Sequence, residues 1–397
     1  MKKIYVLVMM LVFSFALCNV KAANVLNPID KSIKVIGKED VIDDVELDIY
    51  APSAILMEVS TGKIIYQKNS TESKTPASMT KIMTMILVME AISQNKLKMD
   101  DYLKASENAS KMGGTTIYLD TGEEMTVEDL LKGLAITSAN DAAIVFAESI
   151  GGSVEKFVSM MNNKAREIGC VNTHFVNPNG LPADGHHSCS YDMALMGRYL
   201  VSNYPDILKY TNIYEDYLRK GTEKEFWLVN TNKLVRFYEE VDGLKTGWTS
   251  ESGYCLTATM KKNGIRFISV VMGAESTGKR NHDTMTMLNY GVNTYELQKI
   301  ANEGDIIETV ENIYYKPEIF NVVVSEDVEY LAKKGNELKD IKKDIEIFNN
   351  VIDGKIGTMT IYINGELYNK VDLIPSENVK KANFFDIFKS LFNRVFL

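Results

Sequence analysis

The sequence predicts an α+β fold, a sheet flanked by helices, followed by a small all-β domain and a C-terminal amphipathic helix. Strand patterns occur early, at 54–59 and 64–66, and again late, at 254–260 and 265–273. Helical patterns fill the chain between them, so the early and late strands are expected to share one sheet. Short β-rich runs then alternate with charged turns from about residue 304 to 374, which predicts the all-β domain.

The elements of the first domain follow in order along the chain. The two early strands are joined by a turn that contains Gly62. A helix led by Pro76 is predicted next, because the fixed φ and missing N–H of proline suit a first turn. The late strands are joined by Asn263-Gly264, a strong hairpin signal. The remaining predicted elements are helices at 128–137, 142–150, 154–168, 192–203 and 283–297, with a polar loop over 177–190.

The first residues are typical of a secretory signal. Two lysines after Met1 precede a mostly apolar run from Ile4 to Leu17, and Val20-Lys21-Ala22 provides small residues where a signal peptidase cleaves. The apolar run is too short to span a bilayer comfortably. Cys18 could indicate a lipoprotein, but Leu17 stands where a small residue is expected. We therefore expect cleavage after Ala22.

The last residues, 377–397, predict an amphipathic helix. Their phenylalanines and aliphatic residues form a wide apolar face, and three lysines and an arginine add positive charge. Such a segment is too short and too charged to span a bilayer but suits its interface. The alternative is a helix docked on its own protein, and we favour the membrane interpretation.

The charge and the histidines exclude two classes of function. The chain has a net charge of −9 at pH 7, and removal of the signal takes away only lysines, so the mature protein is more acidic still. Because phosphate binding needs a basic surface, no nucleic acid is expected as a partner. The four histidines lack metal-ligand spacing, and adjacent His186 and His187 rarely point at one ion. We predict no metal and no cofactor.

Three cysteines remain after removal of the signal: Cys170, Cys189 and Cys255. An odd number at wide spacing is not a disulfide framework. Each is expected to be a small buried hydrophobic residue rather than a nucleophile. One disulfide among the three is an open alternative.

The stretch TPASMTKIMT places Ser78 and Lys81 three residues apart, on one face of the predicted helix. A serine attacks a carbonyl only if a base takes its proton, and a lysine is such a base only when burial or a second cation lowers its pKa. The pair alone also fits a serine near a helix start and a lysine at the edge of a buried helix. The same spacing recurs at Ser60/Lys63, Ser93/Lys96, Ser153/Lys156 and Ser276/Lys279.

Two further motifs offer the groups that such a pair needs. Lys245-Thr246-Gly247 occurs once, just before the late strands, and brings a second lysine together with a glycine that permits close approach to a sheet edge. Ser138-Ala139-Asn140 lies at the break between two predicted helices and offers polar groups for proton relay. Each motif is weak alone, whereas the ordered set of three is specific.

This set resembles the motifs of the penicillin-binding proteins and serine β-lactamases. The chain is most similar to the low-molecular-weight D-alanyl-D-alanine carboxypeptidases, a resemblance that covers nearly the whole mature chain. The similar stretches are PASMTKIMT, DLLKGLAITSANDAA, NPNGLPADGHHS, DGLKTGWTSESGYCLTAT and ISVVMGA. The resemblance implies a signal peptide over 1–22, a β-lactamase/transpeptidase-like catalytic domain over 45–298, a small β-sandwich domain over 304–375 and a membrane-anchor helix over 377–397.

The resemblance also implies catalytic roles. Ser78 would be the acylated nucleophile and Lys81 its general base. Ser138 would relay the proton to the leaving D-alanine. Asn140 would hold the substrate amide and orient Lys81, and Lys245 would raise the positive potential.

Substrate binding is implied for a second group of residues. Thr246 would hydrogen-bond the substrate next to Gly247, and the backbone N–H groups of Ser78 and Trp248 would hold the oxyanion. Arg280 matches the arginine near the terminal carboxylate of the substrate. Trp248 is bulkier than the residue expected after this motif, and since its backbone forms the contact, its size bears on substrate fit rather than on chemistry.

The expected partners are a peptidoglycan stem peptide ending in D-Ala-D-Ala, β-lactam antibiotics and a membrane surface reached through the C-terminal helix. We expect secretion across the cytoplasmic membrane and action at its outer face, toward the cell wall. One alternative is a class A β-lactamase, but no Glu-x-x-Leu-Asn follows Ser138. Another is a non-catalytic murein-binding or β-lactam-sensing module, which would tolerate loss of Ser78 or Lys81, yet all three motifs are intact.

Overall fold

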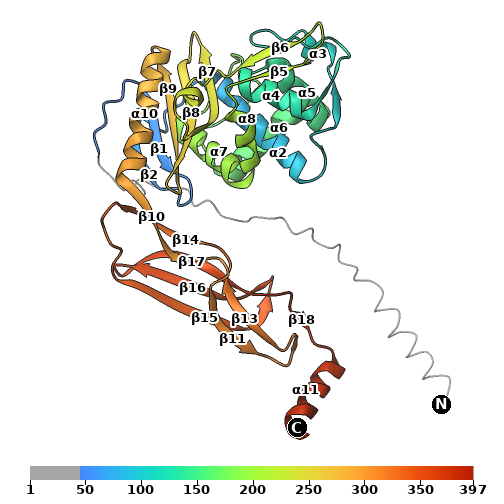
Figure 1. Ribbon diagram of the computed structural model, residues 1–397, viewed down its shortest axis with the longest axis vertical. Coiled ribbons are helices and arrows are strands. Elements are labelled where there is room, and N and C mark those ends of the chain that lie inside the picture. Colours follow the sequence, from blue (N-terminus) through green and yellow to red (C-terminus); the bar gives the residue numbers. More distant parts are fainter. Residues whose placement is uncertain (1–44, 397) are drawn as a thin grey trace, which may run out of the picture. The chain divides into compact units, whose positions relative to one another are not determined.

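The computed structural model describes residues 45–396 (Figure 1). The predicted signal peptide over 1–22 lies outside these residues, as does Cys18. Among the described residues the three remaining cysteines are free and buried. Burial is the first cause that raises the pKa of each thiol, so none of them has the character of a nucleophile.

The sheet of the first domain joins early and late strands, as the sequence predicts. Its order is β2-β1-β9-β8-β7, and each neighbouring pair is antiparallel. Early strand β1 lies beside late strand β9, with Leu56 opposite Ser269. β7 has β8 as its only strand neighbour in this sheet and therefore forms an edge. The strands are β1 Ser53–Glu58, β2 Ile64–Lys68, β7 Val241–Thr249, β8 Gly253–Lys262 and β9 Ile265–Ala274.

Helices cover both faces of this sheet (Figure 1). α10, Thr277–Thr294, packs on one face, where Leu256 and Leu288 belong to one buried apolar cluster. α7, Ser190–Asn203, lies against β1 and β9 from the other face. Because helices cover both faces of the sheet, side chains that point to either face are buried. This explains why β8 and β9 are buried along most of their length.

Most of the other helices of this domain lie on the α7 side, whereas α9 packs on the α10 side, where Leu234 joins the apolar cluster of Leu288. α2, Lys81–Ser93, is buried almost all round, packed against α5, α6 and α7. The remaining long helices are α5 Asn140–Gly151 and α6 Val154–Ile168, and the shorter α4 spans Val127–Lys132. The short elements are β3 Tyr102–Lys104, β4 Glu124–Thr126, β5 Glu215–Leu218, β6 Phe226–Val229, α3 Glu107–Ser110, η4 Pro205–Ile207, α8 Leu208–Thr211 and α9 Leu234–Phe237.

The C-terminal boundary of α10 differs from the prediction. The sequence predicts a helix over 283–297, whereas α10 ends at Thr294 and residues 295–297 begin strand β10, Tyr295–Ala301. β10 pairs with β14, Val328–Lys333, more than one element further along the chain. Periodicity within one segment carries no signal for such a distant strand partner, and for this reason the pattern extends the predicted helix into β10.

The second domain is all β, as predicted. Its main sheet has the order β11-β13-β17-β16-β15, and β10 with β14 and β12 with β18 form two-stranded pairs. Phe320, Met359, Ile361 and Leu373 are among the residues of its buried core. The strands are β11 Ile306–Glu311, β12 Tyr315–Lys316, β13 Ile319–Val324, β15 Ile341–Ile352, β16 Lys355–Ile363, β17 Glu366–Pro375 and β18 Lys380–Lys381.

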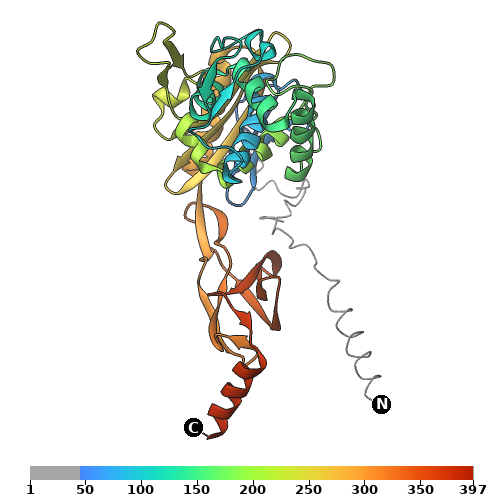
Figure 2. The same cartoon turned by 90° about the vertical axis from the view of Figure 1, so that its right-hand side faces the viewer.

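The C-terminal amphipathic helix is α11, Phe384–Phe396, the red helix near the C-terminus in Figure 2. It begins later than the predicted segment 377–397, because Lys380 and Lys381 form β18, which pairs with β12. Its apolar side chains are exposed: Phe384, Phe385, Phe388, Leu391, Phe392 and Val395. None of the helices in the described part of the chain is long and apolar enough to cross a membrane.

Candidate active site

Ser78 lies on a single 3-10 turn, η2 (Ala77–Thr80), and α2 begins only at Lys81. The sequence predicts one continuous helix here. Ala77 has a φ of 48°, a left-handed conformation that is costly for a residue with a side chain. The strained residue directly before Ser78 interrupts regular helix and sets the direction of the serine, which remains partly exposed.

The amine of Lys81 is completely buried and has three partners. Its Nζ lies 3.0 Å from Ser78 Oγ, 2.7 Å from Asn140 Oδ1 and 2.6 Å from the backbone oxygen of Asn179. The amide and backbone oxygens can only accept a hydrogen bond, whereas the serine hydroxyl can donate one. An ammonium group can donate to all three oxygens. A neutral amine also fits, because it can give its two hydrogens to the amide and backbone oxygens and accept from the serine hydroxyl.

Electrostatics favour the neutral amine over the ammonium ion. Burial is the main cause that lowers the pKa of Lys81 well below its usual value, and the charge of Lys245 lowers it further, against an opposing contribution from Asp141. Burial, followed by the charge of Arg280, lowers the pKa of Lys245 to about 7. The second cation that the chemistry requires is therefore present, on β7.

Asn140 is fixed in the orientation that serves Lys81. It is the first residue of α5 and 4% exposed. Its Nδ2 donates to the backbone oxygen of Gly113 at 2.8 Å, and its backbone N–H donates to that of Thr115 at 2.7 Å. The amide nitrogen thus faces the 113–115 segment, which leaves Oδ1 toward the lysine.

Ser138 is placed by an irregular backbone. It follows the π-helical turn η3, Gly133–Thr137, and has a φ of 72°. Its buried Oγ has no hydrogen-bond partner within the part of the chain that the structure describes. A buried hydroxyl without a partner is unusual, and a left-handed serine is strained, so this position has the marks of a functional residue.

The edge strand β7 lies against η2, and Gly247 makes this possible. A Cβ at position 247 would lie 2.7 Å from the backbone oxygen of Pro76 and 3.2 Å from the Cβ of Ala77. The sequence predicts Lys245-Thr246-Gly247 just before the late strands, whereas the motif lies inside β7. The turn that carries Ser78 and the sheet edge that carries Lys245 are therefore in contact.

The remaining predicted residues lie on or near β7. Thr246 Oγ1 donates to Thr231 Oγ1 at 2.7 Å. The indole of Trp248 is 57% exposed, with its ring centroid 6.0 Å from that of Tyr254. Arg280 comes from α10, is 4% exposed, and donates through Nε and Nη2 to the side-chain oxygen of its neighbour Asn281.

The loop over 177–190 supplies groups that sequence reasoning did not assign. The backbone oxygen of Asn179 accepts from Lys81, and Gly180, with a φ of 84°, passes so close to η2 that a Cβ would lie 1.9 Å from the oxygen of Ala77. His186 contacts Thr80 Oγ1 through Nε2 at 2.8 Å, and its Nδ1 accepts the N–H of Val176. Burial is the main cause that lowers the pKa of His186 to about 4, so its ring is neutral and structural. The sequence signal available for this loop is the turn motif Asn-Pro-Asn-Gly at 177–180.

A serine hydroxyl facing the lone pair of a neutral, buried lysine can be deprotonated as it attacks a carbonyl. The fold around it, a five-stranded antiparallel sheet with helices on both faces, presents this pair at the sheet edge. Fold and site together define a serine hydrolase in which a buried lysine lies beside the serine hydroxyl.

The comparisons with known proteins give the family. Residues 40–276 match the family model described as D-alanyl-D-alanine carboxypeptidase, and residues 295–381 match that described as penicillin-binding protein 5, C-terminal domain. The chain belongs to the D-alanyl-D-alanine carboxypeptidase family, as its motifs indicate.

Curated relatives and solved structures extend this match over most of the chain. It is 45% identical to D-alanyl-D-alanine carboxypeptidase DacF of Bacillus subtilis, across 89% of this chain and 92% of the relative. It is 31% identical to D-alanyl-D-alanine carboxypeptidase DacC of Escherichia coli, across 86% of this chain and 88% of the relative. The structure of penicillin binding protein 5 from Haemophilus influenzae superposes with a TM-score of 0.70 at 27% identity, covering 85% of this chain and all of that one.

We expect Lys81→Arg to abolish acylation by a labelled penicillin while the fold is preserved. Arginine keeps the charge but stays protonated, and loss of a general base costs roughly 10²–10⁴-fold in rate. In the wild type the acylation rate should fall as the pH drops through the lowered pKa of Lys81, because protonation removes the base. The measurement is the acylation rate against pH, with Lys74→Arg as a control outside the base's contacts. Normal acylation by Lys81→Arg would show that the lysine is structural.

We expect Gly180→Ala to impair acylation far more than Gly185→Ala. Both glycines lie in the same loop with positive φ, so alanine adds backbone strain of roughly 1–3 kcal/mol at either position. Only at Gly180 does the added Cβ collide with η2, since at Gly185 the nearest atom is 4.0 Å away. Thermal unfolding and penicillin acylation of the two variants check this, and equal effects would show that the contact with η2 does not matter.

Proposed function

We propose that this protein is a serine-type D-Ala-D-Ala carboxypeptidase that removes the terminal D-alanine from peptidoglycan stem peptides through an acyl-enzyme on Ser78. The observation that carries the proposal is the set of contacts of Lys81: two oxygens that can only accept and one hydroxyl that can donate. The family match supports the substrate class, because the curated relatives are named D-alanyl-D-alanine carboxypeptidases.

In the proposed acylation, Ser78 Oγ attacks the carbonyl of the penultimate D-alanine while its proton passes to Lys81. The N–H groups of Ser78 and Trp248 hold the oxyanion, where each preorganised donor is worth roughly 2.7–4 kcal/mol. Collapse of the tetrahedral intermediate breaks the peptide bond, and the proton of Lys81 reaches the leaving D-alanine nitrogen through Ser138. The unpartnered Oγ of Ser138 is available for that relay within the described structure.

In the proposed deacylation, a water molecule gives its proton to Lys81 and attacks the ester, which releases the shortened peptide and restores the hydroxyl of Ser78. Asn140 holds Lys81 in place and binds the substrate amide. β-Lactams acylate the same serine by opening of their ring. In support, a related penicillin-binding protein D2 from Listeria monocytogenes, 32% identical, was solved in a cefotaxime-bound form.

The free carboxylate of the terminal D-alanine is proposed to bind among Lys245, Thr246 and Arg280, next to Gly247. Two cations here are within electrostatic reach of each other, since the charge of Arg280 lowers the pKa of Lys245. An anionic substrate end would relieve that repulsion, and Thr246, now bonded to Thr231, offers a hydroxyl to it. A chain end would thus be preferred over an internal peptide bond.

We further propose that the mature chain starts after Ala22, that a catalytic domain over 45–298 and a β domain over 304–375 follow, and that the C-terminal segment, 377–397, anchors the enzyme peripherally at the outer face of the cytoplasmic membrane. The polar side of α11 is engaged with the β domain: Arg394 pairs with Glu311 and Glu318, and Asp386 with Lys316 at 2.9 Å. Its phenylalanine side is exposed, and lipid burial of such a face gains about 25 cal/mol per Å².

We expect Ser78→Ala to lose both penicillin labelling and release of D-alanine from a D-Ala-D-Ala peptide. The serine oxygen forms the acyl bond in both reactions, so one substitution must remove both. Mass spectrometry should place the label of the wild type on the peptide that contains Ser78. A label retained by Ser78→Ala, or found at Ser60 or Ser93, would refute the assignment. Penicillin labelling without peptide turnover in the wild type would instead indicate a β-lactam sensor.

We expect deletion of residues 384–397 to release the enzyme from lipid vesicles without loss of peptide hydrolysis. This deletion removes α11 but keeps β18, which belongs to the β domain through its pairing with β12. A second variant replaces Phe384, Phe385 and Phe388 by serine and keeps the polar contacts of α11. Co-sedimentation with anionic vesicles should fall for both variants. Misfolding of the deletion variant together with unchanged binding of the serine variant would show that α11 belongs to the core of the protein.

A further inference from the structure

The orientation of Asn140 depends on a loop that is outside the sequence motifs. The segment 113–123 runs between α3 and α4, and its first residues accept both hydrogen bonds of Asn140. The approach is close, since a Cβ on Gly114 would lie 2.7 Å from Nδ2 of Asn140. Any shift of this loop therefore moves the amide whose oxygen accepts from Lys81.

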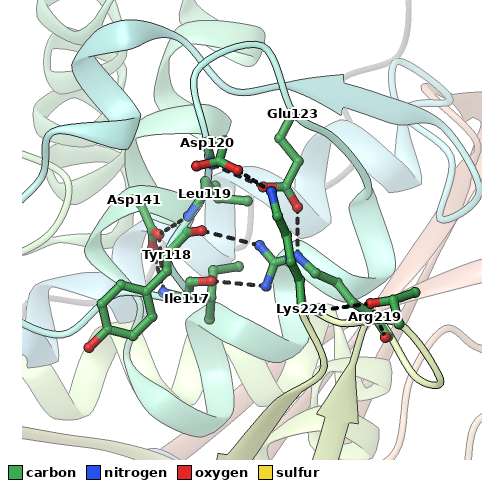
Figure 3. A network of polar contacts seen from close by, with 9 residues as sticks. Ile117, Tyr118, Leu119, Asp120, Glu123, Asp141, Arg219 and Lys224 are labelled. Carbon is green, nitrogen blue, oxygen red and sulfur yellow. Dashed lines mark hydrogen bonds and ion pairs between the residues drawn. The ribbon is translucent and has the colours of Figure 1, made fainter.

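One side of the loop is tied to α5 by Asp141, the residue after Asn140. Its carboxylate accepts the backbone N–H of Ile117 at 3.0 Å and that of Leu119 at 3.2 Å (Figure 3). Asp141 is 1% exposed, and it provides the acceptor for the N–H groups of Ile117 and Leu119. The carbonyl groups on the same stretch need partners from elsewhere.

Arg219, at the turn of the β5–β6 hairpin, provides those partners (Figure 3). Its Nη1 donates to the backbone oxygen of Ile117 at 3.0 Å, its Nη2 contacts that of Tyr118 at 3.5 Å, and its Nε donates to Glu123 Oε1 at 2.6 Å. Glu123 in turn accepts the N–H of Asp120. The Arg219 and Glu123 side chains are 12% and 18% exposed, so this guanidinium is largely enclosed by the loop.

The same hairpin also leads to the opposite wall of the site. Two residues after β6 ends, Thr231 accepts from Thr246 of β7 at 2.7 Å and donates its N–H to the oxygen of Ile136. The hairpin is thus in contact with the Lys-Thr-Gly strand at its end and with the Asn140 loop at its turn. Arg219 itself has a φ of 52°, a strained conformation for a residue with a side chain, which its contacts must offset.

We propose that Arg219 is a positioning residue for catalysis: by binding the 113–123 loop it fixes Asn140, and through Asn140 it fixes the amine of Lys81. This inference rests on the proposed function, in which Lys81 is the general base. Arg219 touches neither Ser78 nor Lys81, so its influence passes through backbone contacts of the loop. The hairpin turn that carries it lies on a surface element, where its sequence could change without disturbing the core.

A looser loop should change the protonation of Lys81 as well as its position. Two charged groups act on this amine: Lys245 on β7, which disfavours its charged form, and Asp141 on α5, which favours it. Movement of Asn140 would admit water to the amine and weaken the burial that keeps it neutral. In a plot of acylation rate against pH, the fall on the acidic side (the acidic limb) should then occur at higher pH. A general loss of stability would instead lower the fraction of folded, active enzyme and leave the pH of the acidic limb unchanged.

The test compares Arg219→Ala with Lys224→Ala in the full chain. Lys224 lies on the same hairpin and pairs with Asp120 of the same loop, but both side chains are about two-thirds exposed, so this pair should matter little. Acylation by a fluorescent penicillin is measured as a second-order rate constant across pH. We expect Arg219→Ala to lose roughly tenfold to a hundredfold at neutral pH and to shift the acidic limb upward, since small misplacements of catalytic groups have effects of this size. Lys224→Ala should stay within about twofold.

Two additional variants separate the possible outcomes. Glu123→Gln keeps the size of the acceptor and the carbonyl contacts of Arg219, so it should fold even if Arg219→Ala does not, and should show a smaller loss with the same direction of shift. Arg219→Lys should recover part of the rate. An acidic limb unchanged in every variant that folds, or equal losses for Lys224→Ala and Arg219→Ala, would overturn the inference. The proposed function fails separately, if Ser78→Ala still acylates.

Discussion

A lysine amine removed from water is the constraint on which this structure depends. An amine buried without partners is strongly unfavourable, so the fold must bring acceptors to Lys81 from elsewhere in the chain. They come from two separate regions, Asn140 on α5 and the backbone of Asn179 in a long loop. The number of acceptors matters as much as their presence. The hydroxyl of Ser78 can donate as well as accept, so a neutral amine keeps all three contacts, while a third carbonyl oxygen in its place could only accept and would favour the ammonium ion.

Backbone packing around η2 is the second requirement, and glycine meets it twice. Gly247 on β7 and Gly180 in the loop both approach the turn of Ser78 more closely than any side chain would permit. Gly247 approaches the backbone oxygen of Pro76, and Gly180 approaches that of Ala77. These contacts explain how strained Ala77 is kept in place: the backbone around it leaves no room to relax. The glycine of the Lys-Thr-Gly motif is thus required by packing, independently of any contact with substrate.

Much of this arrangement could be predicted from the sequence, because its components are local patterns. Helix periodicity gave α6 to the residue, and Asn263-Gly264 marked the β8–β9 hairpin. Spacing brought Ser78 and Lys81 together even though the helix starts later than expected. The contributions of Asn179 and Thr231 could not be read in the same way. Asn179 acts through its backbone oxygen, which every residue has, and Thr231 gains its role only from the fold that sets it opposite Thr246.

The same reasoning explains why the β5–β6 hairpin escaped prediction. Its strands are short, at four residues each, and its sequence is dominated by charged residues that usually indicate a solvated surface. Arg219 is one of several such residues, and only its enclosure by the 113–123 loop separates it from its exposed neighbours. Charge composition describes a segment on average, whereas the role of a single guanidinium depends on which carbonyl groups surround it.

The position of β7 at the edge of its sheet has a consequence for recognition. An edge strand presents backbone N–H and C=O groups along its outer rim, and an extended peptide laid against it continues the sheet by one strand. Such binding reads the main chain of the ligand, which is common to all peptides, while the side chains alternate above and below the new strand. An enzyme built on this rim can be strict about the chain terminus and the stereochemistry at the cleaved bond, yet accept variation in the residues upstream.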